Sequence, residues 1–111
     1  MMHLTFADKS LLVGDVVADL LVEYAAVLAQ AGEADSVSVI AYGSDGQKVT
    51  AKFALTEGAA LLVESTETDL PDPENGEAEM YLREQIMSRK ASAPAPPEDQ
   101  TMPATYDELG L

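Results

Sequence analysis

Carboxylates make up most of the reactive side chains in this chain. The sequence holds 20 Asp and Glu residues but a single histidine, His3, and no cysteine. Nucleophilic catalysis by serine needs a neighbouring base, and thiol chemistry, disulfides and thiolate metal sites all need cysteine. The residue types therefore leave paired carboxylates as the main route to catalysis.

Paired carboxylates are the basis of glycoside hydrolysis and aspartyl proteolysis, so the residue types permit that chemistry. With 20 acids in 111 residues, however, close pairs are expected by chance, and no tryptophan is present to line a sugar cleft. A small domain with short strands also leaves little depth for an active-site pocket. We therefore predict that the protein is not an enzyme and has no catalytic residues.

Metal and cofactor sites are likewise not indicated. The acidic segment 69–77 resembles a calcium loop, but Gly76 at the sixth loop position puts Pro71 at the first, where an Asp ligand is needed. Gly46 at the sixth position puts Ala41 at the first, which fails in the same way. The glycines form no phosphate-binding motif. We expect no metal and no cofactor.

The sharpest pattern is a stripe of three carboxylates, Asp15, Asp19 and Glu23, spaced four residues apart. On a helix they share one face, where like charges at this spacing are modestly destabilising, and no Lys or Arg lies nearby in the same segment. A solvated face in an acidic protein is the commoner case. The alternative is a docking stripe whose repulsion is relieved by a basic partner, which makes these three residues the candidate partner-binding site.

The overall charge restricts the partners. Six Lys and Arg residues against 20 acids give a formal net charge of −14. Such a polyanion is repelled by nucleic-acid phosphates and by anionic membranes, so we expect neither as a partner. Residues 1–55 hold 7 acids and 3 bases, whereas residues 56–111 hold 13 acids and 3 bases. Acids interrupt the apolar stretch 11–31, no secretory leader is recognisable, and we expect a cytoplasmic protein.

Helical periodicity dominates the first third of the chain. We predict a short strand at 3–6, then a helix that begins near Asp8 or Ser10 and ends at Gly32. Its apolar residues cover so wide an arc that most of the helix must be buried. Small residues flank this arc and suit close packing, either on the protein's own sheet or against a second copy: Gly14, Ala18, Ala25 and Ala29.

The period then changes to two. Segments 36–42, 47–55 and 59–65 alternate apolar and polar residues, and glycine-containing turns at 43–46 and 56–58 separate them. Three strands with short connections predict an antiparallel meander with one apolar face. Lys48 and Lys52 lie on the opposite, wet face of this predicted sheet.

An acidic segment with two prolines, 66–74, predicts a loop, and a second helix follows from Pro73 or Glu77 to Arg89. Residues 91–111 contain four of the six prolines and little to bury, which predicts a disordered acidic tail. The end of this tail, 105–111, is either solubilising or a short tethered contact. The expected fold is a single α+β domain over residues 1–90, with a three- or four-stranded antiparallel sheet and two helices mainly on one face.

By elimination, the composition indicates a small acidic protein-binding module whose partner has a basic surface. Immunity proteins, antitoxins and secretion chaperones are of this type. An immunity-type inhibitor fits best, because toxins that attack nucleic acid have basic clefts that an acidic protein reaches by electrostatic steering. The alternative is a homodimeric structural or accessory domain, in which the acidity serves solubility or adaptation to high salt.

Overall fold

The computed structural model describes residues 1–58 and 60–92. Five strands form one antiparallel sheet in the order β4-β3-β2-β1-β5, so the α+β fold is as predicted, with five strands rather than three or four. In chain order the elements are β1 (Met2–Phe6), β2 (Lys9–Val13), α1 (Asp15–Ala31), β3 (Asp35–Tyr42), β4 (Lys48–Leu55), β5 (Leu61–Ser65) and α2 (Gly76–Ser92).

The N-terminal region is a β-hairpin followed by a helix. The predicted first strand is confirmed as β1, but the residues from Lys9 to Val13, expected in the helix, form β2 and pair with β1. The hairpin turn contains Ala7, whose backbone is left-handed with φ 57°. Tight hairpin turns usually carry Asn, Asp or Gly at such a position, so the sequence lacks the ordinary signal. Helix α1 therefore begins only at Asp15.

The C-terminal end of α1 agrees with the prediction. Gly32 adopts a left-handed backbone with φ 66°, which glycine tolerates without steric cost. Its N–H donates to the carbonyl of Ala29, and the N–H of Glu33 donates to the carbonyl of Leu28. These two bonds satisfy carbonyls that the last helical turn would otherwise leave unpaired.

The three strands after α1 do not form the predicted meander. β3 and β4 make a hairpin, but β5 crosses to the other end of the sheet and pairs with β1. The unrecognised β1–β2 hairpin offers a free edge there. By pairing with it, β5 places Leu61 and Val63 opposite Phe6 and Leu4, so that all four side chains face the core.

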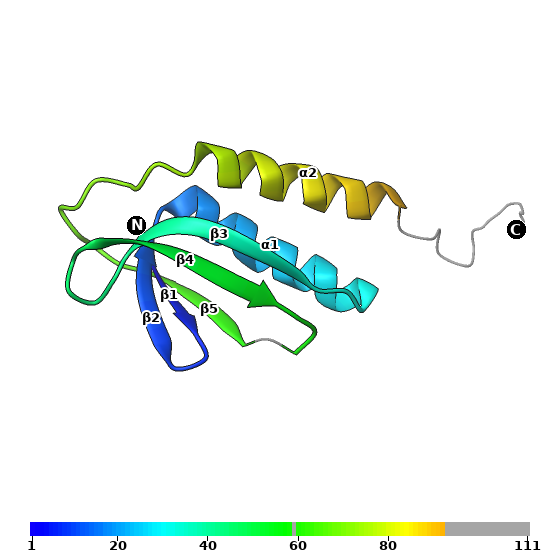
Figure 1. The fold of residues 1–111 in the computed structure, drawn as a ribbon, viewed down its shortest axis with the longest axis horizontal. Helices are drawn as coiled ribbons and strands as arrows, with labels where there is room; N and C mark the ends of the chain where they lie inside the picture. Colours follow the sequence, from blue (N-terminus) through cyan, green and yellow to red (C-terminus); the bar gives the residue numbers. More distant parts are fainter. Residues whose placement is uncertain (59, 93–111) are drawn as a thin grey trace, which may run out of the picture.

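The sheet divides into two parts between β2 and β3. A single residue pair, Leu12 with Tyr42, joins these strands, and the β3–β4 hairpin and the other three strands diverge from that junction (Figure 1). The rings of Phe6 on β1 and Phe53 on β4 nevertheless meet edge to face, with centroids 5.5 Å apart. The sheet is therefore strongly curved, and its inner face surrounds the core.

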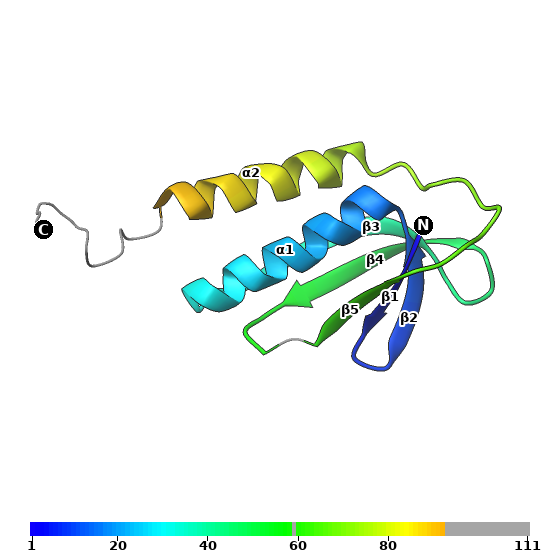
Figure 2. The same cartoon turned by 180° about the vertical axis from the view of Figure 1, so that it is seen from behind.

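The two helices lie side by side against this sheet, with α1 across it and α2 next to α1 (Figure 2). Val16 and Val22 of α1 stay exposed, although Val16 belongs to the apolar arc that is predicted to be buried. The two helices and the sheet share one core, whose largest fully buried side chains are Leu4, Val13, Val17, Leu21, Tyr24, Leu28, Val39, Leu55 and Leu82.

Helix α2 begins at Gly76, between the two predicted starts at Pro73 and Glu77, and it extends beyond the predicted end at Arg89. Ala91 and Ser92, predicted to begin the tail, are its last two residues, and the remainder of the predicted tail, 93–111, lies outside the described residues. Over residues 1–58 and 60–92, neither helix combines the length and the hydropathy needed to cross a bilayer.

Candidate functional site

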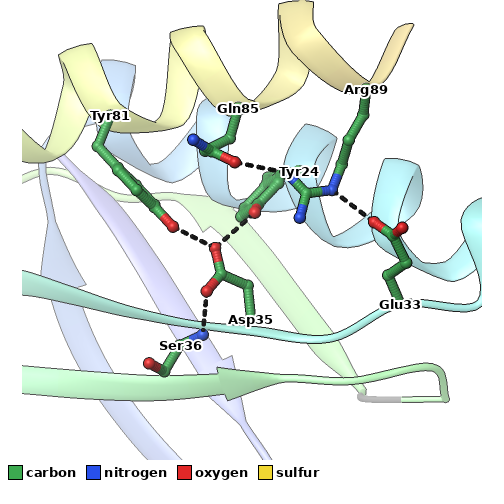
Figure 3. Close-up of polar contacts among 7 residues, drawn as sticks. All are labelled: Tyr24, Glu33, Asp35, Ser36, Tyr81, Gln85 and Arg89. Atoms are coloured by element: carbon green, nitrogen blue, oxygen red, sulfur yellow. Dashed lines mark hydrogen bonds and ion pairs between the residues drawn. The ribbon is translucent and has the colours of Figure 1, made fainter. Parts of the chain in front are cut away.

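The most connected polar side chain is that of Asp35, at the start of β3. The hydroxyls of Tyr24 on α1 and Tyr81 on α2 both donate to its Oδ2, the first at 2.5 Å. The backbone N–H of Ser36 donates to its Oδ1 at 2.8 Å. Figure 3 shows the two tyrosine hydroxyls converging on the carboxylate from the two helices. One carboxylate therefore ties three elements together.

Arg89 on α2 extends this group of residues. Its Nε donates to Oε1 of Glu33 at 2.8 Å, and its Nη1 donates to Oε1 of Gln85 at 2.6 Å (Figure 3). Its guanidinium also lies 5.2 Å from the ring centroid of Tyr24, an attractive cation–π arrangement. Below, these residues are called the Asp35 cluster: Tyr24, Glu33, Asp35, Ser36, Tyr81, Gln85 and Arg89.

The electrostatics of the Asp35 cluster favour fixed protonation states. Partial burial raises the pKa of Asp35, but the hydrogen bonds from Tyr24, Tyr81 and Ser36 outweigh it, and the pKa lies below its usual value. The pKa of Tyr24 is raised mainly by burial and then by its hydrogen bond to Asp35. The pKa of Tyr81 is raised mainly by its hydrogen bond to Asp35 and then by burial. A general acid or base needs a pKa near the working pH. The cluster is therefore suited to holding elements together rather than to proton transfer.

His3 lies on the outer face of the sheet. Its Nδ1 is 3.9 Å from Oε1 of Glu64 on β5. The hydroxyls of Thr5 and Ser10, on the same face of the hairpin, are 3.3 Å apart and bond to each other. The imidazole thus faces a carboxylate, and these two hydroxyls pair with each other.

The three residues of the predicted stripe are all exposed on α1 but differ in their contacts. Asp15 lies 2.7 Å from the amino group of Met1, and Glu23 lies 2.9 Å from Nζ of Lys90 on α2. Asp19, between them, forms no ion pair with any residue in 1–58 or 60–92. Positive groups from other segments therefore offset both ends of the stripe.

The acidic connection between β5 and α2 reaches the N-terminal end of α1. A Cβ placed on Gly14 would lie 3.7 Å from the carboxyl carbon of Asp72. The hydrogen bond to Asp15 and the negative charges of Asp15 and Asp72 raise the pKa of the Met1 amino group. Asp15, Asp19 and Asp72 are exposed, and they are called the acidic corner below. Carboxylates near a helix N-terminus also interact favourably with the helix dipole, which stabilises this arrangement in the free protein.

A cleft of about 740 Å³ lies between the β1–β2 hairpin and β4. Two lysines and two carboxylates line it, Lys9, Lys52, Asp8 and Asp45, and it is called the lysine cleft below. Its apolar lining comes from both walls: Phe6, Leu11, Val49, Ala51 and Phe53.

The lining of the lysine cleft holds as many lysines as carboxylates, whereas the molecule as a whole is strongly acidic. Lys9, Lys48 and Lys52 form no ion pair within the described ranges, whereas Arg89 and Lys90 do. Lys9 begins β2, and the acidic corner follows the end of β2, so the length of this strand separates the two regions.

Sequence reasoning misses the Asp35 cluster. The pattern assigns Tyr24 and Tyr81 to apolar helix faces and leaves Asp35 in a connection. A signal does exist, because the hydroxyl of a buried tyrosine usually needs a partner. With 20 acids in the chain, nothing in the sequence identifies which one supplies it.

No group of three or more His, Cys, Asp or Glu side chains in the described ranges is arranged to hold a metal ion. Comparison with protein families, with curated proteins and with solved structures finds no significant match to this chain. Function must therefore be inferred from the geometry and charge of the chain itself.

Proposed function

We propose that the protein is a cytoplasmic, non-enzymatic binding module that engages a basic surface of another protein through the acidic corner. Two roles suit such a module: inhibition of the partner, as by an immunity protein or antitoxin, and chaperoning of the partner. One observation carries the proposal. Asp72 comes from the connection before α2 and Asp15 and Asp19 from α1, yet all three lie near the same helix end, and no Lys or Arg of the described residues forms an ion pair with them.

The physical reason is electrostatic. The Met1 amino group and the dipole of α1 offset part of the repulsion among these carboxylates, and a partner rich in Lys or Arg relieves the remainder on binding. The net charge of −14 adds a long-range field that accelerates encounter with a basic partner and that salt screens. The non-enzymatic role rests on the residue types, since the sequence holds one histidine and no cysteine.

The test compares two substitutions that change the net charge equally. Asp19→Lys alters the acidic corner, and Glu57→Lys alters an exposed residue in the turn between β4 and β5. Proteins retained by the wild type from its source cells are identified, and association rates are measured at low and at physiological salt. We expect Asp19→Lys to slow association about tenfold and Glu57→Lys to change it less than about twofold.

Two results would count against this function. Equal slowing by both substitutions would reduce the effect to net charge and leave the acidic corner without a specific role. An association rate that does not fall with added salt would contradict a basic partner altogether.

A homodimeric accessory domain is the second candidate, and exposed apolar side chains favour it. Met80 and Met87 of α2 are 64% and 69% exposed and are spaced seven residues apart, which puts them on one face of the helix. Exposed methionines are common on adaptable binding surfaces. Sedimentation over a wide concentration range tests this candidate: a dimer that Met87→Lys dissociates supports it, and a monomer throughout removes it.

A further inference from the structure

The outer edge of β4 carries backbone groups whose direction can be derived from the ladder. The amide side chain of Asn75 bonds both backbone groups of Ile40 on β3: Oδ1 accepts from the N–H at 2.7 Å, and Nδ2 donates to the C=O at 2.8 Å. The N–H and C=O of Ile40 therefore point away from β4. Since Ile40 pairs with Thr50, the backbone groups of Thr50 must also point away from β3, toward the free edge of β4.

The same alternation repeats along the strand. In an antiparallel ladder every second residue points its backbone groups outward, so Lys48, Lys52 and Ala54 follow Thr50. β4 is the last strand of the sheet on this side, and no hydrogen bond from the described residues reaches these groups. The backbone groups of Ile40 on β3 are bonded by Asn75, whereas the corresponding groups on the outer edge of β4 are left open.

The lysine cleft runs along this open edge. Residues from both faces of β4 line it, Ala51 and Phe53 from the inner face and Thr50 and Lys52 from the outer face, as a cavity beside a strand edge requires. The opposite wall is the β1–β2 hairpin. An edge with unsatisfied N–H and C=O groups, next to an apolar lining, is the geometry at which an added strand gains both hydrogen bonds and buried apolar area.

Charge defines the occupant further. Lys9 and Lys52 line the cleft, and Lys48 lies four residues before Lys52 on the same strand. None of the three has a carboxylate partner within the part of the chain that the structure describes. Asp8 and Asp45 also line the cleft, so three lysines stand against two carboxylates, a small local excess of positive charge in a chain of net charge −14. Carboxylates on the occupant would complement it.

We propose that the lysine cleft binds an extended peptide segment of another protein, which adds a strand to the free edge of β4. Its apolar side chains enter the cleft between Phe53 and the β1–β2 hairpin, and its acidic side chains pair with Lys9, Lys48 or Lys52. This site is distinct from the acidic corner, and it recognises a partner of the opposite charge, so it does not depend on the function proposed above.

The probe is a synthetic peptide of about seven residues in which valine alternates with glutamate, matching the period of a strand, and a peptide with lysine in place of glutamate is its control. Binding to the full chain is followed by amide chemical shifts and by hydrogen exchange. We expect the acidic peptide to shift and protect the amides of Thr50 and Lys52, and the basic peptide to bind at least about fivefold more weakly.

Two variants and one matched control locate the site. Thr50→Pro removes an outward N–H without deleting a bond to β3, and we expect about tenfold weaker binding. Lys52→Glu should weaken binding about fivefold, whereas Arg83→Glu, an equal charge change at an exposed residue of α2, should leave it within about twofold. Circular dichroism of each variant shows whether the fold is retained.

Several results would overturn the proposal. Lysines on an edge strand also discourage aggregation, and a purely protective role predicts no affinity for the acidic peptide. Equal binding to the wild type and to both Thr50→Pro and Lys52→Glu would place the peptide elsewhere. Sedimentation that shows a dimer, dissociated by Thr50→Pro, would assign the edge to a second copy of this chain instead.

Discussion

The Asp35 cluster and the lysine cleft both place polar groups between packed elements, and they differ in how completely those groups are paired. In the cluster, the Asp35 carboxylate accepts three hydrogen bonds and Arg89 has two acceptors and an aromatic ring. In and beside the cleft, Lys9, Lys48 and Lys52 form no ion pair with the described residues, and the outward backbone groups of β4 have no partner among them.

This difference separates polar groups that stabilise the fold from polar groups that are free to bind a partner. A partly buried polar group that is fully paired contributes to stability, and removing one member leaves the others unsatisfied. An exposed group without a partner contributes little to stability but is free to bind something else. Substitutions in the cluster should therefore lower the free energy of unfolding, and substitutions in the cleft should alter binding.

The largest expected effect is from Asp35→Ala. The hydroxyls of Tyr24 and Tyr81 lose their acceptor, and the first belongs to a fully buried side chain, so we expect the free energy of unfolding to fall by about 3 kcal/mol. Urea denaturation measures it. Asp45→Ala, at an exposed turn, is the control and should cost less than about 1 kcal/mol. A loss below 1 kcal/mol for Asp35→Ala would show that the cluster is not structurally important.

The next effect concerns Asn75, the residue that bonds the backbone of Ile40 on β3. Its side chain is 7% exposed and makes two hydrogen bonds to Ile40. Asn75→Ala leaves an N–H and a C=O unpaired, and we expect a loss of about 2 kcal/mol. The amide of Ile40 should also exchange faster with solvent, whereas Glu74→Ala, next to it and exposed, should change neither quantity. Unchanged exchange at Ile40 would contradict these two hydrogen bonds.

A smaller effect is expected from acidification. Because the pKa of Asp35 lies below its ordinary value in the folded protein, the unfolded chain binds the proton more readily, and stability from this group is present above the unfolded pKa. That stability is lost as the pH falls through the folded pKa. The stability difference between the wild type and Asp35→Asn should therefore shrink from about pH 6 to about pH 3 in denaturation experiments. A constant difference would refute the assignment of an ionised Asp35.

The smallest effect is expected in the cleft itself. Lys9→Glu and Lys52→Glu replace exposed lysines without ion pairs, so each should change the free energy of unfolding by less than about 0.5 kcal/mol. Thermal and urea denaturation measure it. A loss of more than 1 kcal/mol would mean that these lysines stabilise the folded chain, and the contrast with the Asp35 cluster would disappear.

Local patterns in the sequence predict the elements that carry a recognised signal. Gly32 marks the end of α1, the turns around Gly46 and Gly58 separate strands, and alternation identifies β3 and β4. The β1–β2 turn is missed because Ala7 occupies a left-handed position without the usual residue type. That one omission also explains why β5 is predicted beside β4 rather than beside β1.

The candidate sites show the same limit. The stripe Asp15, Asp19 and Glu23 follows from helical spacing, but the sequence does not show that Lys90 pairs with Glu23 or that Asp72 lies near Asp15. These contacts join segments that are far apart in the chain. They depend on how α2 and the connection before it pack against α1.

Composition and periodicity by themselves determined the acidity, the α+β class and the order of three strands and a helix after residue 32. These properties depend on residue counts and on spacing within single segments. Only the tertiary structure decided which strand neighbours which, which of the 20 acids is bonded by two tyrosines, and where the unpaired lysines gather. The physical reason is that strand pairing and side-chain hydrogen bonds are made across the molecule, and many pairings satisfy the same local pattern equally well.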